Sequence, residues 1–200
     1  MSKKISKFVI SKFQVLAVVL FRLITTPFIK RSSETRLNLQ LLKGQPVVFA
    51  ANHTYRLDPP AIFSTLSNRD LISCSKMKFM TGKKIYYSML PILYLTGCYP
   101  TKWAKHAGVK GSIYYLKQGY KVFIFPEGRL NPGRKKNIAH NGISRILSGL
   151  ESPRLILVRA KWTKGDSLFS RYSLHTIFSE VDDNIDINDP KQIMDAIYAL

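Results

Sequence analysis

The sequence has few of the features that define several common protein classes. It contains only two cysteines, Cys74 and Cys98, which lie in or beside apolar runs and lack the spacing of metal ligands. We interpret them as reduced core residues of a cytosol-facing protein, without a disulfide framework and without a metal site. No Gly-x-Ser-x-Gly motif is present, so the sequence offers no hydrolase-type serine. It also has no internal repeat and no low-complexity linker.

Acidic residues are scarce, with 12 Asp and Glu against 31 Lys and Arg, which gives a formal net charge of +19 at pH 7. Residues 1–150 hold 25 of the basic and 4 of the acidic side chains, whereas residues 151–200 hold 6 and 8. So large a positive field indicates a polyanionic partner, either nucleic acid or an anionic membrane surface. Because no known nucleic-acid-binding motif appears and the N-terminal stretch is apolar, we expect membrane lipids and no nucleic acid.

An uninterrupted hydrophobic run of membrane-spanning length is also missing. Residues 4–29 predict one amphipathic helix, but Lys12 and Arg22 would lie near mid-bilayer and cost ~2.5–3.5 kcal/mol each. We therefore expect the helix to lie in the membrane interface, with a core-packing helix as the alternative. Interrupting charges and the lack of an Ala-x-Ala site argue against a signal peptide. The polar stripe of the helix consists of Lys4, Lys7, Ser11, Gln14, Arg22 and Thr25.

From residue 46 onward, short apolar runs alternate with helical stretches. This alternation, in a chain of 200 residues with 46% hydrophobic content, predicts a single α/β domain with a largely parallel mixed sheet flanked by helices. We place that domain at residues 32–200 and the membrane-associating helix at residues 1–31. The predicted strands are 47–51, 71–75, 98–100, 122–125, 155–160 and 174–178. The predicted helices are 59–66, 85–95, 107–118, 139–148 and 190–199, the last capped by Asn188 or Asp189.

A histidine and an aspartate follow the first predicted strand of the domain. His53 and Asp58 stand between the apolar run that ends at Ala51 and the helix that opens with Pro59. In an open α/β sheet, ligands bind outside the carboxyl ends of the strands. His53 as proton acceptor, with Asp58 bonded to its other ring nitrogen, forms two-thirds of a Ser-His-Asp triad, and the missing hydroxyl would belong to the substrate. The alternative is a structural pair in which the aspartate caps the helix.

Two further turns bring charged residues to strand ends. The segment Phe125-Pro126-Glu127-Gly128-Arg129 follows a buried strand; its arginine suits a phosphate, and its glutamate suits an ion pair or a substrate hydroxyl. Gly128 tolerates a positive φ or the close approach of a ligand. Lys102, just past a third strand, offers a point charge for a phosphate. A plain turn and a surface lysine remain the alternatives.

Together these segments resemble the glycerolipid acyltransferase family typified by the 1-acylglycerol-3-phosphate acyltransferases. The resemblance covers roughly residues 45–160. It rests on His53 and Asp58, in the order His-x4-Asp, followed by the Phe-Pro-Glu-Gly segment that begins at Phe125. It implies transfer of a fatty acyl group from acyl-CoA or acyl carrier protein, as a co-substrate with no further cofactor, to a hydroxyl of a lysophosphatidate-like acceptor in phospholipid biosynthesis. The N-terminal helix and the reduced cysteines independently predict a protein held at the cytoplasmic face of a membrane, peripheral or monotopic through that helix.

The same resemblance implies a role for each candidate residue. His53 would be the general base oriented by Asp58, Lys102 and Arg129 would anchor the acceptor phosphate, and Glu127 would hold a glycerol hydroxyl beside Gly128. Departures from the family pattern fall in the phosphate-binding segments: Trp103 occupies the usual arginine position next to Lys102, and no Ser or Thr precedes Arg129. These departures affect the expected identity of the acceptor more than the expected acyl-transfer reaction. A non-catalytic lipid-binding relative and a basic nucleic-acid-binding domain are the alternative functions.

Overall fold

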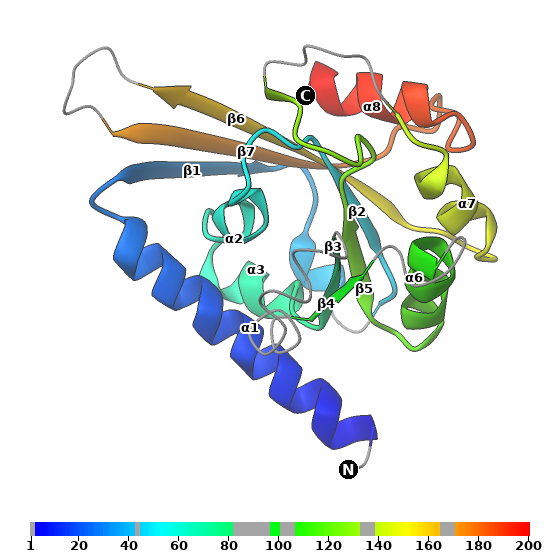
Figure 1. Cartoon of the computed structure of the whole chain (residues 1–200), viewed down its shortest axis with the longest axis horizontal. Helices are drawn as coiled ribbons and strands as arrows, with labels where there is room; N and C mark the ends of the chain where they lie inside the picture. The colour runs from blue at the N-terminus through cyan, green and yellow to red at the C-terminus, as the bar shows by residue number, and fades with distance from the viewer. Residues whose placement is uncertain (1–2, 43–44, 82–96, 101–106, 133–138, 165–170) are drawn as a thin grey trace.

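The structure, a computed structural model, describes residues 3–42, 45–81, 97–100, 107–132, 139–164 and 171–200 and is built on a seven-stranded sheet (Figure 1). The strand order is β1-β7-β6-β2-β5-β3-β4, and only the β6–β7 pair is antiparallel. The strands are β1 (Ile29–Thr35), β2 (Val48–Ala51), β3 (Met77–Thr81), β4 (Cys98–Pro100), β5 (Lys121–Ile124), β6 (Leu155–Lys164) and β7 (Tyr172–Glu180). The helices are α1 (Lys3–Thr25), η1 (Leu39–Leu42), α2 (Asp58–Phe63), α3 (Asn68–Ser73), α6 (Ala107–Lys117), α7 (Gly142–Ser148) and α8 (Pro190–Ala199).

Helices cover both faces of the sheet, so its central strand β2 is apolar at every position. In β2, Phe49 and Ala51 pack toward α1, α2 and α3, whereas Val48 and Ala50 pack toward α6, α7 and α8. All four side chains are fully buried. A parallel strand buried on both faces reads as a continuous hydrophobic run rather than an alternating one. The predicted single α/β domain with a largely parallel sheet is therefore confirmed.

Most predicted elements lie where the sequence places them, but the strand expected at residues 71–75 is wrong. That stretch belongs to α3, whose first turn is capped by Ser67: its hydroxyl oxygen accepts the N–H of Asp70, and the Asp70 carboxylate accepts the Ser67 hydroxyl. Ser-x-x-Asp is a helix-start signal, and here it outweighs the apolar run that follows it. The strand comes six residues later, as β3. The helix predicted at 85–95 lies outside the described residues.

The helix predicted at residues 4–29 ends earlier than expected, at Thr25, and Ile29 begins an unpredicted strand. Strand β1 pairs in parallel with β7, so that Ile29 lies opposite Tyr172. Its sequence, Ile-Lys-Arg-Ser-Ser-Glu-Thr, is polar because β1 is an edge strand with mostly exposed side chains. Hydrophobic patterning therefore could not reveal it. Residue 31, where the sequence places the division between helix and domain, lies within this strand.

Polar side chains of α1 bond to the domain rather than facing away from it. The side-chain amide of Gln14 donates to the carbonyl of Met77 and accepts the Met77 N–H at 3.1 Å. The guanidinium of Arg22 donates to the carbonyls of Ser64 at 3.0 Å and Leu66 at 2.7 Å. These carbonyls lie just past the end of α2, where helical carbonyls lack intrahelical partners. Arg22 thus caps α2 from a neighbouring helix.

The apolar surface of α1 is divided between the core and the exterior. Val15, Val18 and Val19 pack against the core with partial burial. Beyond them lies a set of exposed residues that we call the apolar ridge. It comprises Leu16, Leu20, Leu23 and Ile24 of α1 and Phe28 of the turn that follows the helix, with exposed fractions of 53%, 48%, 66%, 71% and 65%. Among the described residues, no helix is both long enough and apolar enough to cross a bilayer.

The capping role of Arg22 leads to a stability prediction. Arg22→Ala leaves the Ser64 and Leu66 carbonyls without a charged donor, so we expect the free energy of unfolding to fall by about 1–3 kcal/mol in urea titrations. Lys110→Ala, which removes an exposed cation from α6, serves as the control and should change it by less than about 0.5 kcal/mol. Equal effects of the two substitutions would show that Arg22 does not join α1 to α2.

Candidate active site

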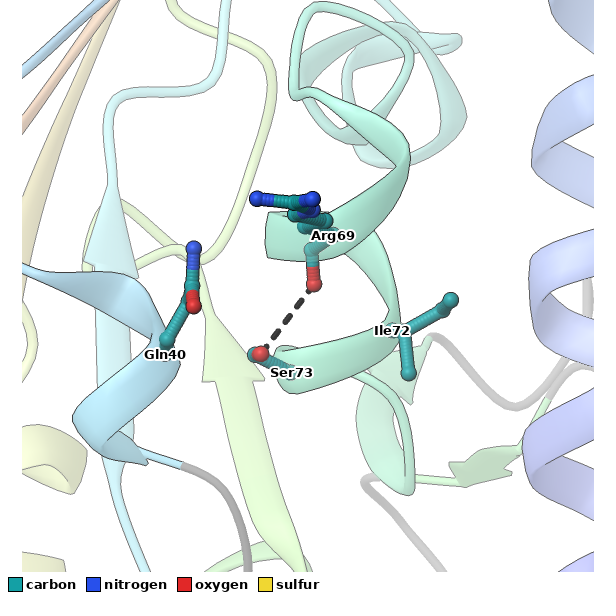
Figure 2. A pocket seen from close by; sticks show the side chains of 4 residues that line it. All are labelled: Gln40, Arg69, Ile72 and Ser73. Atoms are coloured by element: carbon teal, nitrogen blue, oxygen red, sulfur yellow. Dashed lines mark hydrogen bonds between the residues drawn. The ribbon is translucent and has the colours of Figure 1, made fainter.

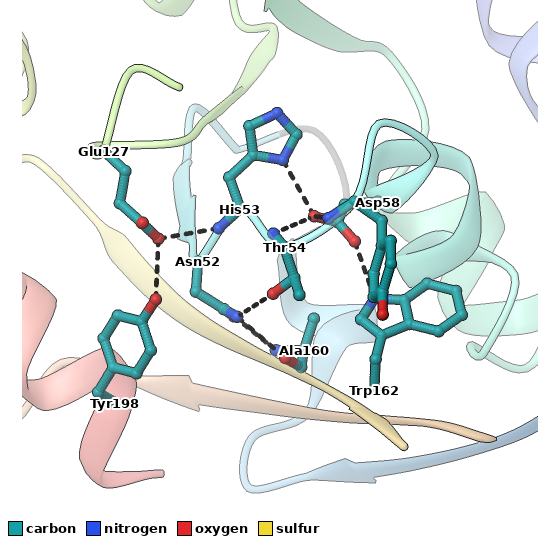
Figure 3. Close-up of polar contacts among 9 residues, drawn as sticks. Asn52, His53, Thr54, Asp58, Glu127, Ala160, Trp162 and Tyr198 are labelled. Carbon is teal, nitrogen blue, oxygen red and sulfur yellow. Dashed lines mark hydrogen bonds and ion pairs between the residues drawn. The ribbon is translucent and has the colours of Figure 1, made fainter. Parts of the chain in front are cut away.

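The imidazole of His53 and the carboxylate of Asp58 meet at the carboxyl end of β2 (Figure 3). His53 Nδ1 lies 3.0 Å from Asp58 Oδ2. The Asp58 side chain is completely buried, whereas 18% of the His53 side chain is exposed. The other ring nitrogen, Nε2, points away from Asp58 (Figure 3). The imidazole therefore bonds to a buried acid through one nitrogen, while its other nitrogen points away and the side chain remains partly exposed.

The surroundings of Asp58 determine which nitrogen of His53 carries the proton. Oδ2 accepts the main-chain N–H groups of Thr54 at 2.6 Å and Tyr55 at 2.8 Å, and Oδ1 accepts the indole N–H of Trp162 at 2.8 Å. A carboxylate that accepts three N–H donors is an acceptor for the imidazole as well. Nδ1 of His53 is thus the donor, which leaves the lone pair of the neutral ring on Nε2. That tautomer can accept a proton at the exposed edge.

The turn after β5 holds His53 through its main chain and its ring. The His53 N–H donates to Glu127 Oε1 at 2.9 Å, and the His53 carbonyl accepts the Asn131 N–H at 2.7 Å. The ring of Phe125 stacks on the imidazole, with centroids 3.9 Å apart and planes 13° apart. Strand β5 lies beside β2 in parallel, so the two turns leave the same edge of the sheet. The two sequence motifs therefore form one structural unit.

Glu127 lies beneath this unit rather than at its surface. Its side chain has no exposed area, and Oε1 accepts the Tyr198 hydroxyl at 3.2 Å in addition to the His53 N–H. Oε2 has no hydrogen-bond partner among the described residues. Tyr198 comes from α8, at the C-terminal end of the described chain. The carboxylate thus links α8 to the main chain of the histidine.

The two residues after Glu127 are exposed. Gly128 has φ +64°, a left-handed conformation that disfavours side chains, and a Cβ there would lie 2.6 Å from the His140 ring. Glycine is therefore required at this turn by both conformation and space. Arg129 follows on the same turn with its side chain exposed. Lys102, the other predicted phosphate ligand, lies outside the described residues.

Strand β6 supports the histidine turn from the other side of β2. The Asn52 side chain accepts the Ala160 N–H at 2.7 Å and donates to the Ala160 carbonyl at 2.9 Å. Two residues further along β6, Trp162 bonds to Asp58. Asn52 thus continues the strand pairing where the β2 backbone turns away. The turn is consequently fixed at both its beginning and its end.

The structure joins His53 to Asp58 and to Glu127, and Gly128 and Arg129 follow Glu127 on the same turn. Sequence reasoning missed three supporting contacts: the Trp162 indole on Asp58, the Tyr198 hydroxyl on Glu127 and the Phe125 ring on the imidazole. The phenylalanine was part of a recognised motif, but its ring had no assigned role. Nothing in the local sequence around the tryptophan or the tyrosine indicates a partner more than 70 positions away.

A shallow cavity lies elsewhere, between η1 and α3. It has a volume of about 300 Å³ and is lined by Gln40, Arg69, Ile72 and Ser73 (Figure 2). Because η1 leads into β2 and α3 leads into β3, the cavity lies toward the amino ends of these strands. It contains none of the predicted site residues, so we do not assign it to the same site.

Comparisons with known proteins agree with this geometry. A family model described as "Acyltransferase" matches residues 31–153, more than half of the chain. The chain is 24% identical over 210 residues to Tafazzin from Drosophila melanogaster, an alignment that covers 96% of this chain and 54% of the fly protein. It therefore spans about half the length of that relative. The fold is similar to the crystal structure of the 1-acyl-sn-glycerophosphate (LPA) acyltransferase PlsC from Thermotoga maritima. That match has a TM-score of 0.66 and 13% identity, and it covers 98% of this chain and 80% of the other.

The buried carboxylate leads to a second prediction. In Asp58→Asn, the amide NH₂ group must face either the Trp162 N–H or the main-chain N–H groups of Thr54 and Tyr55, so at least one buried donor loses its acceptor. We expect a loss of about 2–4 kcal/mol in the free energy of unfolding, measured in urea. Asp183→Asn, an exposed control, should stay within about 0.5 kcal/mol of the wild type. An Asp58→Asn protein as stable as the control would refute the described hydrogen bonding.

Proposed function

The chain belongs to the acyltransferase family, and on this premise we propose that it transfers a fatty acyl group from a thioester carrier to a glycerolipid hydroxyl. The carrier is acyl-CoA or acyl carrier protein, and the acceptor is a lysophosphatidate-like lipid. The observation that carries the proposal is the His53 imidazole, which bonds through Nδ1 to a buried carboxylate, points Nε2 away from it and remains partly exposed. The structurally similar bacterial enzyme is named for 1-acyl-sn-glycerophosphate, which supports this class of acceptor.

In the proposed reaction, His53 acts as a general base. Nε2 takes the proton of the acceptor hydroxyl as its oxygen attacks the thioester carbonyl, which forms the new C–O bond. The tetrahedral intermediate then collapses, the C–S bond breaks, and the imidazolium returns the proton to the departing thiolate. Because a thioester is already activated, the protein needs no nucleophile of its own. Asp58 holds the reactive tautomer and stabilises the imidazolium.

We assign the acceptor phosphate to the turn that follows β5. Arg129 is exposed one residue past Gly128, and a guanidinium binds phosphate through two parallel hydrogen bonds. Lys102 is proposed as a second phosphate ligand from the sequence alone. For Glu127 we propose a structural role, in which it holds the main chain of His53, instead of a contact with the glycerol hydroxyl. The side chain is buried, and Oε1 already accepts two donors.

The decisive test is an acyl-transfer assay with acyl-CoA and acyl carrier protein donors and a panel of lysophospholipid acceptors. We expect His53→Ala to lower the rate by ~10²–10⁴-fold while the protein stays folded, because the base is lost. His175→Ala is the control, since it removes a partly exposed imidazole of β7 that bonds only to Ser32 in the described structure. Near-normal turnover of His53→Ala would remove the acid–base role. A wild-type protein that binds lipid but transfers no acyl group would favour a non-catalytic function.

We also propose that the protein associates with anionic membranes through the apolar ridge of α1. Five large apolar side chains are exposed there, and a chain of net charge +19 is attracted to an anionic surface. Exposed basic residues lie at both ends of the described ridge, Lys12 before it and Lys30 after it. An amphipathic helix that places apolar side chains among lipid tails and cations among headgroups binds in the interfacial plane. The acceptor and product lipids would then lie in the same membrane as the enzyme.

The membrane proposal predicts the effect of polar substitutions on the ridge. Leu20→Gln with Ile24→Gln should weaken partitioning to vesicles that contain anionic phospholipid by at least about tenfold, because the apolar area available for insertion shrinks. Sedimentation with the vesicles measures the effect. Leu41→Gln with Ile72→Gln, two exposed apolar residues of η1 and α3, is the matched control and should leave binding unchanged. Equal losses in both pairs would assign binding to general surface hydrophobicity.

A further inference from the structure

We propose that Tyr198 of α8 is a positioning residue of the acyl-transfer site, which acts through Glu127 on the main chain of His53. This inference rests on the proposed function and adds a residue that neither sequence motif contains. Tyr198 is 145 positions from His53 in the sequence, yet a single carboxylate oxygen separates its hydroxyl from the histidine N–H. Helix α8 is therefore part of the support of the catalytic base.

The first step of the argument is the unequal bonding of the Glu127 carboxylate. Oε1 accepts both the His53 N–H at 2.9 Å and the Tyr198 hydroxyl at 3.2 Å, whereas Oε2 has no partner among the described residues. A fully buried carboxylate is stable only when hydrogen bonds compensate its lost hydration. Both donors act on the same oxygen, so they fix the rotation of the carboxylate together. Removal of the Tyr198 hydroxyl leaves the histidine N–H to fix it alone.

The second step is the way in which Tyr198 itself is held. The guanidinium of Arg159, on β6, lies over the phenol ring, 4.2 Å from its centroid. Burial and the neighbouring Glu127 carboxylate raise the pKa of Tyr198 to about 12, so its hydroxyl stays a donor at neutral pH. Ile193, Met194 and Ile197 of α8 are buried in the core against the sheet. The hydroxyl thus comes from a rigid element.

The third step concerns which kinetic parameter this contact affects. The His53 main chain is held at its N–H by Glu127 and at its carbonyl by Asn131. A looser N–H contact allows the residue, and with it the Nε2 atom, to shift relative to the reacting hydroxyl. The proposed phosphate ligand, Arg129, lies on the exposed side of the turn and does not depend on the Tyr198 hydroxyl. Misplacement of the base should therefore lower kcat and leave the KM values unchanged.

The test compares Tyr198→Phe, which keeps the ring under Arg159, with Tyr114→Phe, which removes an exposed hydroxyl from α6. We expect Tyr198→Phe to lower kcat by about tenfold with unchanged KM for donor and acceptor, and Tyr114→Phe to match the wild type. In the Glu127→Ala background, Tyr198→Phe should add less than a twofold loss, because its acceptor is already gone. Additive losses, or a Tyr198→Phe enzyme with wild-type kcat, would overturn the proposal.

A second measurement does not depend on activity or on the folding of the Glu127 variant. Hydrogen exchange of the His53 amide, followed by NMR, should become several-fold faster in Tyr198→Phe, and exchange in α7 should stay the same. Unchanged exchange at His53 would contradict the link even if kcat falls. If the wild-type protein transfers no acyl group, the proposed function fails, and the exchange experiment still decides whether Tyr198 holds the histidine.

Discussion

The burial of the Asp58 carboxylate is the constraint on which the rest of the site depends. An ionised carboxylate removed from water loses several kcal/mol of hydration, and only hydrogen bonds from well-placed donors compensate that loss. Here the donors are the N–H groups of Thr54 and Tyr55, the indole of Trp162 and the imidazole of His53. These requirements close the turn, attach it to β6 and orient the ring. The pairing of His53 with Asp58 is thus a consequence of how the fold accommodates one buried carboxylate.

The sheet order explains why two motifs separated by 74 positions become neighbours. Strand β2 lies in the centre of the sheet, with β5 on one side and β6 on the other, all three parallel. Their carboxyl ends therefore meet at one edge, which is where open α/β sheets bind ligands. Each of the three strands contributes a different part of the site. His53 follows β2, the turn that holds its main chain follows β5, and Trp162 lies on β6. None of these three groups needs a long loop to reach its position.

Local sequence patterns predicted the parts of this arrangement that depend on local chemistry. Apolar runs mark β2 and β5 because both faces of these strands are buried, and the polar residues after them mark the site. Trp162 and Tyr198 were not predictable, because their importance lies in partners that only the tertiary fold brings near. Strand β1 was missed for a related reason: an edge strand paired through its backbone needs no apolar pattern. Helix α3 was misassigned because the prediction followed the apolar run Leu71-Ile72 and did not use the helix-start signal formed by Ser67 and Asp70.

Helix α1 shows why amphipathicity alone does not tell which face of a helix meets the protein. The sequence contains a polar stripe that would ordinarily face water, yet Gln14 and Arg22 bond to main-chain groups of the domain. The carbonyls bonded by Arg22 follow α2, and the main-chain groups bonded by Gln14 lie at the start of β3. At both places the backbone needs hydrogen-bond partners, which polar side chains supply. Once polar residues satisfy the backbone on the inner side, much of the apolar surface of the helix must face outward. Five apolar side chains that face only water do not stabilise the protein, whereas the same side chains would favour contact with lipid. The same side chains that attach α1 to the domain therefore leave its apolar ridge facing outward.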